Sequence, residues 1–162
     1  MANEILIKEK TTLTFDTTTT PALTLTSLGS AAGRVSAIKD LGAATYPRRY
    51  VWRLKTKFAS APAEGRVIEV YIAYSNDASG TIQDGAVGTA NAALSSVNQR
   101  FMCQLVGHAY CRNVTTALYT SGVFEIRGRY ISVVVYNDTD QALSGTAGDH
   151  KIELMPIAEE VQ

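Results

Sequence analysis

Hydrophobic and polar residues alternate with a period of two along much of this chain. The clearest example is the segment 122–137, where two alternating runs lie on either side of Gly128. In the second run Ile131, Val133 and Val135 share one face. Successive side chains of a β-strand point to opposite faces of a sheet, so the pattern predicts two half-buried strands.

The same alternation predicts further strands, separated by turn-forming residues, and no long helix. The candidate segments are 11–15, 22–28, 34–38, 50–58, 66–74, 100–111, 114–120, 122–127, 130–137 and 151–157. Short strands at this spacing are typical of sandwiches, jelly rolls and barrels. We therefore expect an all-β fold, an antiparallel two-sheet sandwich that is jelly-roll-like, with an extended N-terminal arm.

Segment 50–58 has the most regular alternation of apolar and basic residues. We expect it to pair with 66–74 as an antiparallel hairpin around 59–65. Its predicted buried face carries Trp52, Leu54, Thr56 and Phe58.

A chain of 162 residues has the length of one domain. We predict an N-terminal arm at 1–10, a single β-sandwich domain at 11–157 and a polar C-terminal tail at 158–162. Segment 75–93 is rich in Asn, Asp, Gly, Ser, Thr and Ala, which predicts a long loop that carries contacts rather than core. A short helix is predicted within 90–99.

The chain carries 15 Lys and Arg against 15 Asp and Glu, so its formal net charge is zero. A neutral protein has no global field that attracts nucleic acid or an anionic membrane. No run approaches the roughly 18 apolar residues of a membrane span, and no secretory signal is recognisable. We expect synthesis in a cytoplasm, with neither nucleic acid nor membrane as a partner.

Cys103, His108 and Cys111 are the densest group of soft metal ligands. Zinc requires four converging ligands, and we expect two buried cysteines with a surface or hydrogen-bonded histidine instead. On one straight strand the cysteines share a face about 26 Å apart, too far for a disulfide. A hairpin at Gly107 would change that, so their redox state stays open.

Two other groups have the residue types of catalytic or metal sites. His150 beside Asp149 has the composition of a general base and its orienting carboxylate, but no nucleophile motif accompanies it. Residues 137–140 offer oxygen ligands for calcium, without the spacing of a calcium-binding loop. We interpret the first group as a strand cap and the second as a turn, and predict no metal, no cofactor and no enzymatic activity.

The densest positive cluster comprises Arg48, Arg49, Arg53, Lys55 and Lys57. Such a cluster would bind phosphate, nucleic acid or an acidic protein surface, or would simply be a solvated strand face. For a neutral chain, an acidic protein surface fits better than nucleic acid.

Three stretches of the second half, 66–77, 129–144 and 150–157, resemble small virion proteins of tailed bacteriophages. Those proteins are jelly-roll or β-sandwich proteins that decorate or cement the capsid, usually as oligomers. The likeness covers roughly 48–157 and is one of strand order and sequence pattern. The Thr-rich N-terminal part matches less well.

The resemblance implies a non-enzymatic virion structural protein that binds the major capsid protein. It further implies a homo-oligomer, a trimer or a dimer, made in the host cytoplasm. We expect contacts through loops and the N-terminal arm. The candidate contact residues are Ile5, Ile7, Arg48, Arg49, Arg53, Lys55, Lys57, Asn76, Asp77 and Asp84.

Two alternatives stay open. A tail or fibre module, or a carbohydrate-binding β-sandwich, would bind sugars through exposed aromatic side chains. The candidates for that role are Tyr46, Tyr50, Tyr74, Tyr110, Tyr119 and Tyr136. A hydrolase on a β scaffold would require a converging set of acid, base or metal ligands.

Overall fold

The computed structural model describes residues 5–43 and 46–161, and the side chains of 10–43 and 46–158. Its strands are β1 (Ile5–Glu9), β2 (Leu13–Phe15), β3 (Ala32–Val35), β4 (Lys39–Asp40), β5 (Arg49–Thr56), β6 (Val67–Ser75), β7 (Ala92–Ala93), β8 (Gln104–Tyr110), β9 (Leu118–Glu125), β10 (Tyr130–Asp138) and β11 (Lys151–Val161). The 3-10 helices are η1 (Asp84–Ala86), η2 (Val97–Met102) and η3 (Ala147–Asp149). Across these described residues, no helix is both long and apolar enough to cross a membrane.

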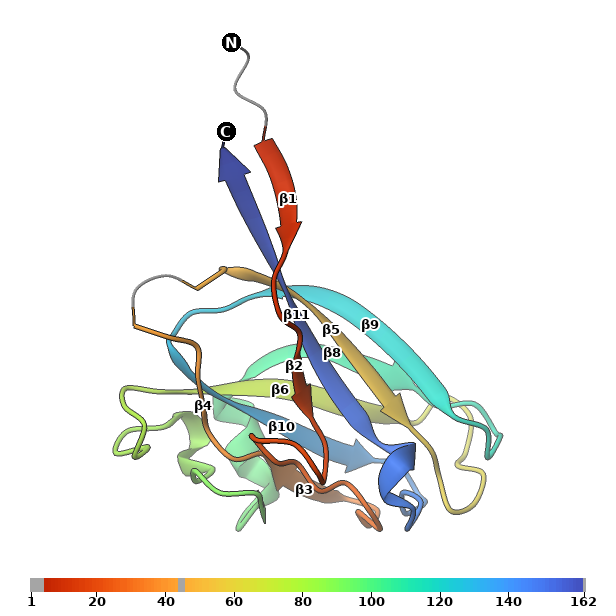
Figure 1. Cartoon of the computed structure of the whole chain (residues 1–162). Coiled ribbons are helices and arrows are strands. Elements are labelled where there is room, and N and C mark those ends of the chain that lie inside the picture. Colours follow the sequence, from red (N-terminus) through yellow and green to blue (C-terminus); the bar gives the residue numbers. More distant parts are fainter. Residues whose placement is uncertain (1–4, 44–45, 162) are drawn as a thin grey trace.

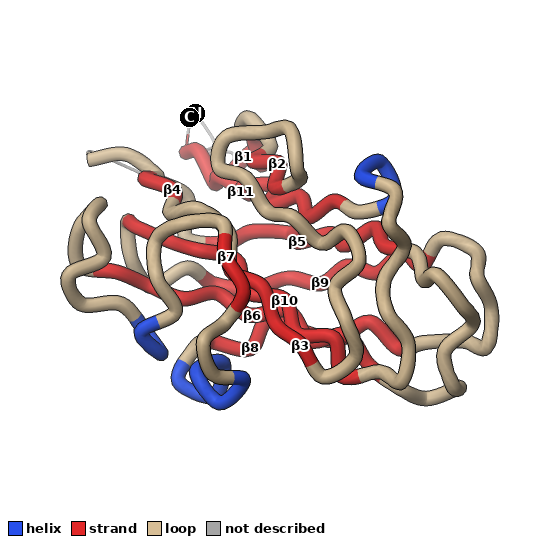
Figure 2. Tube along the Cα trace, turned by 90° about the horizontal axis from the view of Figure 1, so that it is seen from below, coloured by secondary structure: helices blue, strands red, loops and turns tan. Residues whose placement is uncertain are grey.

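The strands form two antiparallel sheets that pack face to face (Figure 1). Sheet A has the order β1-β11-β5-β9, with β2 also paired to β11. Sheet B has the order β7-β3-β10-β6-β8, with β4 also paired to β10. Figure 2 shows the strands of the two layers with loops at their ends. The predicted all-β, jelly-roll-like sandwich is confirmed.

The main core lies between the sheets, because the apolar side of each alternating strand faces inward. The predicted inward face of 50–58 is confirmed, since Trp52, Leu54, Thr56 and Phe58 are all buried. Facing them from sheet B are Ile68, Val70, Ile72, Ile131, Val133 and Val135.

A second, smaller core covers the outer face of sheet B. Val87, from the long loop, is only 6% exposed and packs with Tyr71 of β6 and Val134 of β10. The expectation that 75–93 carries contacts rather than core was therefore incomplete. The predicted helix at 90–99 is displaced, because the structure has β7 there and begins η2 at Val97.

The predicted hairpin of 50–58 with 66–74 is wrong. β5 pairs with β9 and β11, whereas β6 pairs with β8 and β10. The connection 57–66 thus crosses from one sheet to the other, as sandwich connections do.

Two strand predictions require correction. Residues 22–28 form no strand, although Leu23 and Leu25 are buried. The alternation of buried and more exposed residues in 22–28 arises in an irregular segment that packs on the core without joining a sheet. The two strands predicted at 114–120 and 122–127 are one strand, β9.

The N-terminal arm and the C-terminal tail pair with each other. β1 runs antiparallel to the end of β11, with Ile5 opposite Val161 and Glu9 opposite Ile157. The pairing of β5 with β11 ends where Arg49 lies opposite Ile157. The two-stranded ribbon of β1 and β11 therefore extends beyond the sandwich (Figure 1). The predicted arm is thus a paired strand, and the tail predicted from residue 158 continues β11 to Val161.

Candidate functional site

The outer face of sheet A is the candidate binding surface, because the alternation of β5 turns its basic residues outward. Tyr50, Trp52 and Leu54 are buried, whereas Arg53 is exposed on the opposite side of the strand. Pairing in sheet A then sets the neighbours of each outward residue.

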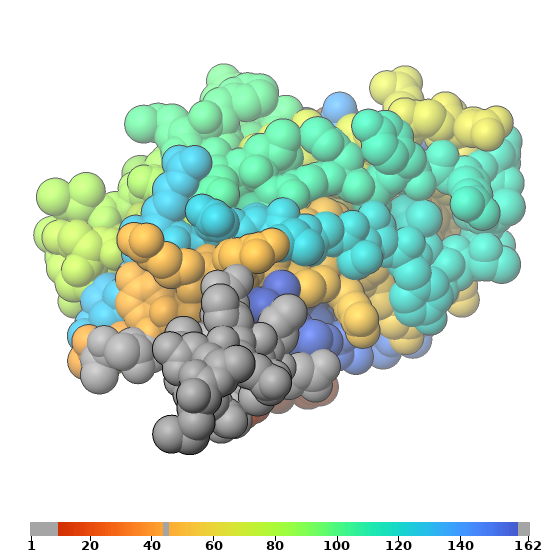
Figure 3. All heavy atoms as spheres, turned by 90° about the horizontal axis from the view of Figure 1, so that it is seen from above, coloured from red at the N-terminus to blue at the C-terminus, as the bar shows by residue number. Residues whose placement is uncertain are grey.

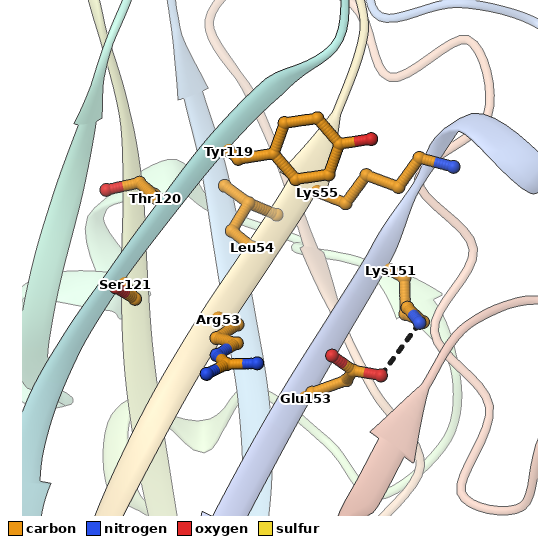
Figure 4. Close-up of a pocket in the computed structure, with 8 residues that line it drawn as sticks. All are labelled: Arg53, Leu54, Lys55, Tyr119, Thr120, Ser121, Lys151 and Glu153. Carbon is orange, nitrogen blue, oxygen red and sulfur yellow. Dashed lines mark ion pairs between the residues drawn. The ribbon is translucent and has the colours of Figure 1, made fainter.

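The register groups polar side chains at one end of this face. Lys55 lies between Tyr119 of β9 and Lys151 of β11. The next row along β5 places Arg53 between Ser121 and Glu153. These residues line an open hollow of about 540 Å³ (Figure 4), which we call the Tyr119 hollow.

The Tyr119 hollow carries an excess of positive charge. Lys151 forms an ion pair with Glu153 at 2.7 Å, so these two charges offset each other. The Lys55 ammonium donates a hydrogen bond to the carbonyl oxygen of Gly148 at 2.8 Å, which holds the side chain without neutralising it. The Arg53 guanidinium has no hydrogen bond or ion pair with any described residue.

Tyr119 joins this hollow to two others. Its side chain is 70% exposed. Tyr119 also lines a hollow of about 330 Å³ with Arg112, and one of about 390 Å³ with Glu64 and Tyr110. Figure 3 shows this side of the molecule, where the green atoms of β8 and the cyan atoms of β9 form a continuous surface beside β5.

The predicted basic cluster is divided along β5. Arg53 and Lys55 line the Tyr119 hollow. Lys57 lies beyond the strand, with its ammonium 3.8 Å from an Asp149 carboxylate oxygen. Arg48 and Arg49 lie at the opposite end, near the ribbon, since Arg49 pairs with Ile157.

The predicted loop residues Asn76, Asp77 and Asp84 lie away from this surface, after β6 of sheet B. Each accepts a backbone N–H through its side-chain oxygen, from Ile82 at 3.1 Å, Thr81 at 3.1 Å and Tyr74 at 3.2 Å respectively. Bonds from Thr81 also lower the pKa of Asp77. The structure gives these residues a role within the loop, and their contact with a partner stays a prediction.

Ile5 and Ile7 belong to β1, opposite Val161 and Glu159. Their side chains lie outside those the structure describes. As a backbone element, β1 is the end strand of sheet A, and its second edge has no partner strand within 5–43 and 46–161.

The tyrosines expected to be exposed differ in how far the structure exposes their side chains. Tyr110 and Tyr119 are exposed, whereas Tyr50 is buried in the core. Tyr136 is covered by the Arg100 guanidinium, 3.6 Å from its ring centroid. Tyr74 is partly buried and its hydroxyl donates to Gln104 Oε1 at 2.6 Å.

Arg100 anchors η2 on sheet B, a role that sequence reasoning missed. Its Nε lies 2.9 Å from Glu69 Oε2, which also accepts a hydrogen bond from the Tyr71 hydroxyl at 2.7 Å. The prediction of one strand over 100–111 is therefore wrong at its start. η2 begins with a capping box formed by Ser96 and Gln99, and this sequence pattern could have predicted the start of the helix.

The two cysteines lie on opposite faces of sheet B, which corrects the expectation of a shared face. Cys103 precedes β8 and packs in the outer cluster, while Cys111 follows β8 and packs in the main core. A bulge in β8 opposite Val70 and Tyr71 shifts the alternation between them. Burial, with a contribution from Asp84, raises the pKa of Cys103 to about 12; burial, with Asp140, raises that of Cys111 to about 11.

His150 is buried and forms two hydrogen bonds. Nε2 lies 2.9 Å from the Ser144 carbonyl oxygen, and Nδ1 lies 2.9 Å from Thr56 Oγ1. A carbonyl only accepts, so Nε2 carries the proton and Nδ1 accepts from Thr56. Burial lowers the pKa of His150, against the opposing hydrogen bond to Ser144. This arrangement agrees with a cap on β11.

Residues 137–140 hold a loop together. The Asn137 amide donates to the carbonyl oxygens of Leu28, Gly29 and Gln141, at 3.1, 3.0 and 2.8 Å. Within the part of the chain that the structure describes, no three His, Cys, Asp or Glu side chains form a group suited to a metal ion.

Comparisons with known proteins give little further information. No family model matches the chain, and no curated protein matches it. Among solved structures, it is similar to one described as the crystal structure of murine APRIL at pH 5.0. That match has 10% identity and a TM-score of 0.39, and covers 80% of this chain and 77% of the other. Similarity at this level gives no basis for a function.

Proposed function

We propose that this chain is a non-enzymatic structural protein of a phage virion that binds the major capsid protein as a decoration or cement protein. The resemblance of 66–77, 129–144 and 150–157 to such proteins motivates the proposal. Its fold class is also the one that this resemblance implied.

The observation that carries the proposal is the ribbon formed by β1 and the end of β11. It projects from the sandwich (Figure 1), and β1 is the end strand of sheet A. An edge strand presents unpaired N–H and C=O groups, to which a strand of another protein can add. The major capsid protein would supply that strand.

The outer face of sheet A extends the same contact. Arg49 lies opposite Ile157, and Ile157 lies opposite Glu9, so the base of the ribbon is continuous with β5. The exposed cation Arg48 precedes this row. An acidic patch on the capsid protein would complement the charge of Arg48.

An exposed apolar patch supports the homo-oligomer, a trimer or a dimer. Phe101 and Met102 at the end of η2 are 67% and 74% exposed, and Leu105 of β8 lies close by in sequence and is also exposed. Large apolar side chains grouped at a surface are typical of protein interfaces. Cyclic homo-oligomers of this kind fit capsid symmetry axes.

Co-sedimentation with empty capsid shells of the encoding phage tests the proposal. The full chain should sediment with the shells, and a variant lacking residues 1–9 should lose most of that binding. Circular dichroism must show that the shortened chain keeps its β-structure. Failure of the full chain to sediment with shells would overturn the proposal.

A further inference from the structure

The Tyr119 hollow has the side chains of a saccharide site rather than of a protein interface. An exposed aromatic ring stands beside charged and hydroxyl groups, with Tyr119 and Lys55 opposite each other on neighbouring strands. In Figure 4 the Tyr119 ring reaches from β9 across β5, next to the Lys55 chain. Ligand sites combine such an apolar surface with a few polar groups that fix orientation.

The spacing of these groups suits one sugar ring with an acidic substituent. Diagonal neighbours across an antiparallel pair, such as Tyr119 and Arg53, lie about 7–8 Å apart. A pyranose ring stacked on Tyr119 would therefore bring a carboxylate within reach of the Arg53 guanidinium. Arginine binds a carboxylate through two parallel hydrogen bonds, and the Arg53 guanidinium has no hydrogen bond or ion pair with a described residue.

The remaining charges narrow the ligand class. Lys55, whose ammonium donates a hydrogen bond to the Gly148 carbonyl oxygen, is a second cation; it forms no ion pair with a described carboxylate, although its charge interacts with that of Asp149. Glu153, fixed by Lys151, retains acceptor capacity for a sugar hydroxyl and repels a densely charged anion. A ligand with one negative charge per sugar fits this set better than a phosphate or a heavily sulfated chain does.

We propose that the Tyr119 hollow binds a saccharide that carries a carboxylate, such as a uronic acid. Tyr119 provides the stacking surface, Arg53 and Lys55 bind the carboxylate, and Glu153 accepts from a hydroxyl. The hollow and the ribbon lie at opposite ends of sheet A, since Arg49 and Lys55 are six residues apart on β5, about 20 Å. A virion protein attached through its ribbon would thus present this site away from the attachment point.

Calorimetric titration of the full chain with trigalacturonate tests the site, with its methyl ester as the uncharged counterpart. The acid should bind, and the ester should bind at least about tenfold more weakly, because a charge-assisted hydrogen bond is lost. Tyr119→Ala should weaken binding of both ligands. Arg53→Gln should weaken binding of the acid by about tenfold and leave binding of the ester unchanged.

Ile82→Ala is the matched control, because Ile82 is 71% exposed, about as exposed as Tyr119, but lies in the loop after β6 of sheet B. It should bind trigalacturonate normally. Absence of binding to the acid, equal binding of acid and ester, or full affinity in Tyr119→Ala would overturn the proposal. Inorganic phosphate that competes as strongly as trigalacturonate would also overturn it. Tyr119→Ala should still sediment with capsid shells, so this test and the capsid test can fail separately.

Discussion

The Trp52 indole of β5 packs directly against two glycines, Gly107 of β8 and Gly122 of β9. Replacing Gly107 by alanine should therefore destabilise the fold through a clash with Trp52. An alanine Cβ at position 107 would lie 2.3 Å from Trp52 Cζ2, and one at Gly122 would lie 2.6 Å from Trp52 Nε1. The indole would have to retreat by about 1 Å to restore a contact distance of ~3.5 Å. Trp52 is buried and its Nε1 has no hydrogen-bond partner among the described residues, so no polar contact guides such a shift. We expect Gly107→Ala to destabilise the fold by about 1–3 kcal/mol.

Urea unfolding followed by circular dichroism gives the free energies for a double-mutant cycle with Trp52→Phe. The clashing atoms belong to the six-membered ring of the indole, and the shorter phenylalanine side chain would leave that space vacant. The effect of Gly107→Ala should therefore shrink by at least ~1 kcal/mol in that background. Gly148→Ala is the control, because nothing lies within 4 Å of its added Cβ and its stability should change little. An unchanged effect of Gly107→Ala in the Trp52→Phe background would refute the reasoning.

Three further predictions concern other buried groups. Arg100→Met should destabilise the fold by about 1–3 kcal/mol in urea unfolding, because it leaves the partly buried Glu69 carboxylate without its cation. The folded-state pKa of His150 is lowered from its ordinary value of 6.5, so near that pH the folded chain binds fewer protons than the unfolded chain. The free energy of unfolding should therefore be highest above pH 6.5, as far as His150 determines it, and should decrease as the pH falls below that value. Melting temperatures should show that decrease, and His150→Gln should reduce it; an equal decrease in the variant would contradict this assignment. Both thiols should react slowly with a thiol reagent at neutral pH and quickly in denaturant, because burial raises the pKa of Cys103 to about 12 and of Cys111 to about 11. Rapid labelling of the folded protein would contradict that burial.

Local alternation predicted the strands, but strand partners depend on the whole chain. The inward face of β5 followed from the two-residue period, because burial on one side of a strand is a local property. The prediction that 130–137 is half-buried was wrong, because β10 is buried on both faces and Val87 of the long loop packs on its outer side. The hairpin of 50–58 with 66–74 was wrong because adjacency in sequence does not decide which sheet a strand joins. The strand predicted at 22–28 failed because Leu23 and Leu25 are buried without a ladder.

The candidate site was predictable only in part for the same reason. The alternation of 50–58 identified Arg53 and Lys55 as outward cations. Lys151 and Glu153 joined them only through the pairing of β11 with β5, which no local pattern specifies. Tyr119 was one of six candidate tyrosines. The alternation of β5 places Tyr50 on the buried face, but only the three-dimensional structure shows that Tyr119 lines the hollow.

Cryo-electron microscopy of virions of the encoding phage tests the capsid proposal most directly. The proposal predicts many copies of this two-sheet sandwich on the capsid surface, at symmetry-related positions. In each copy the ribbon of β1 and β11 should contact the major capsid protein, with the Tyr119 hollow turned away from it. Absence of the protein from capsids, or its presence only in the tail, would contradict the proposal.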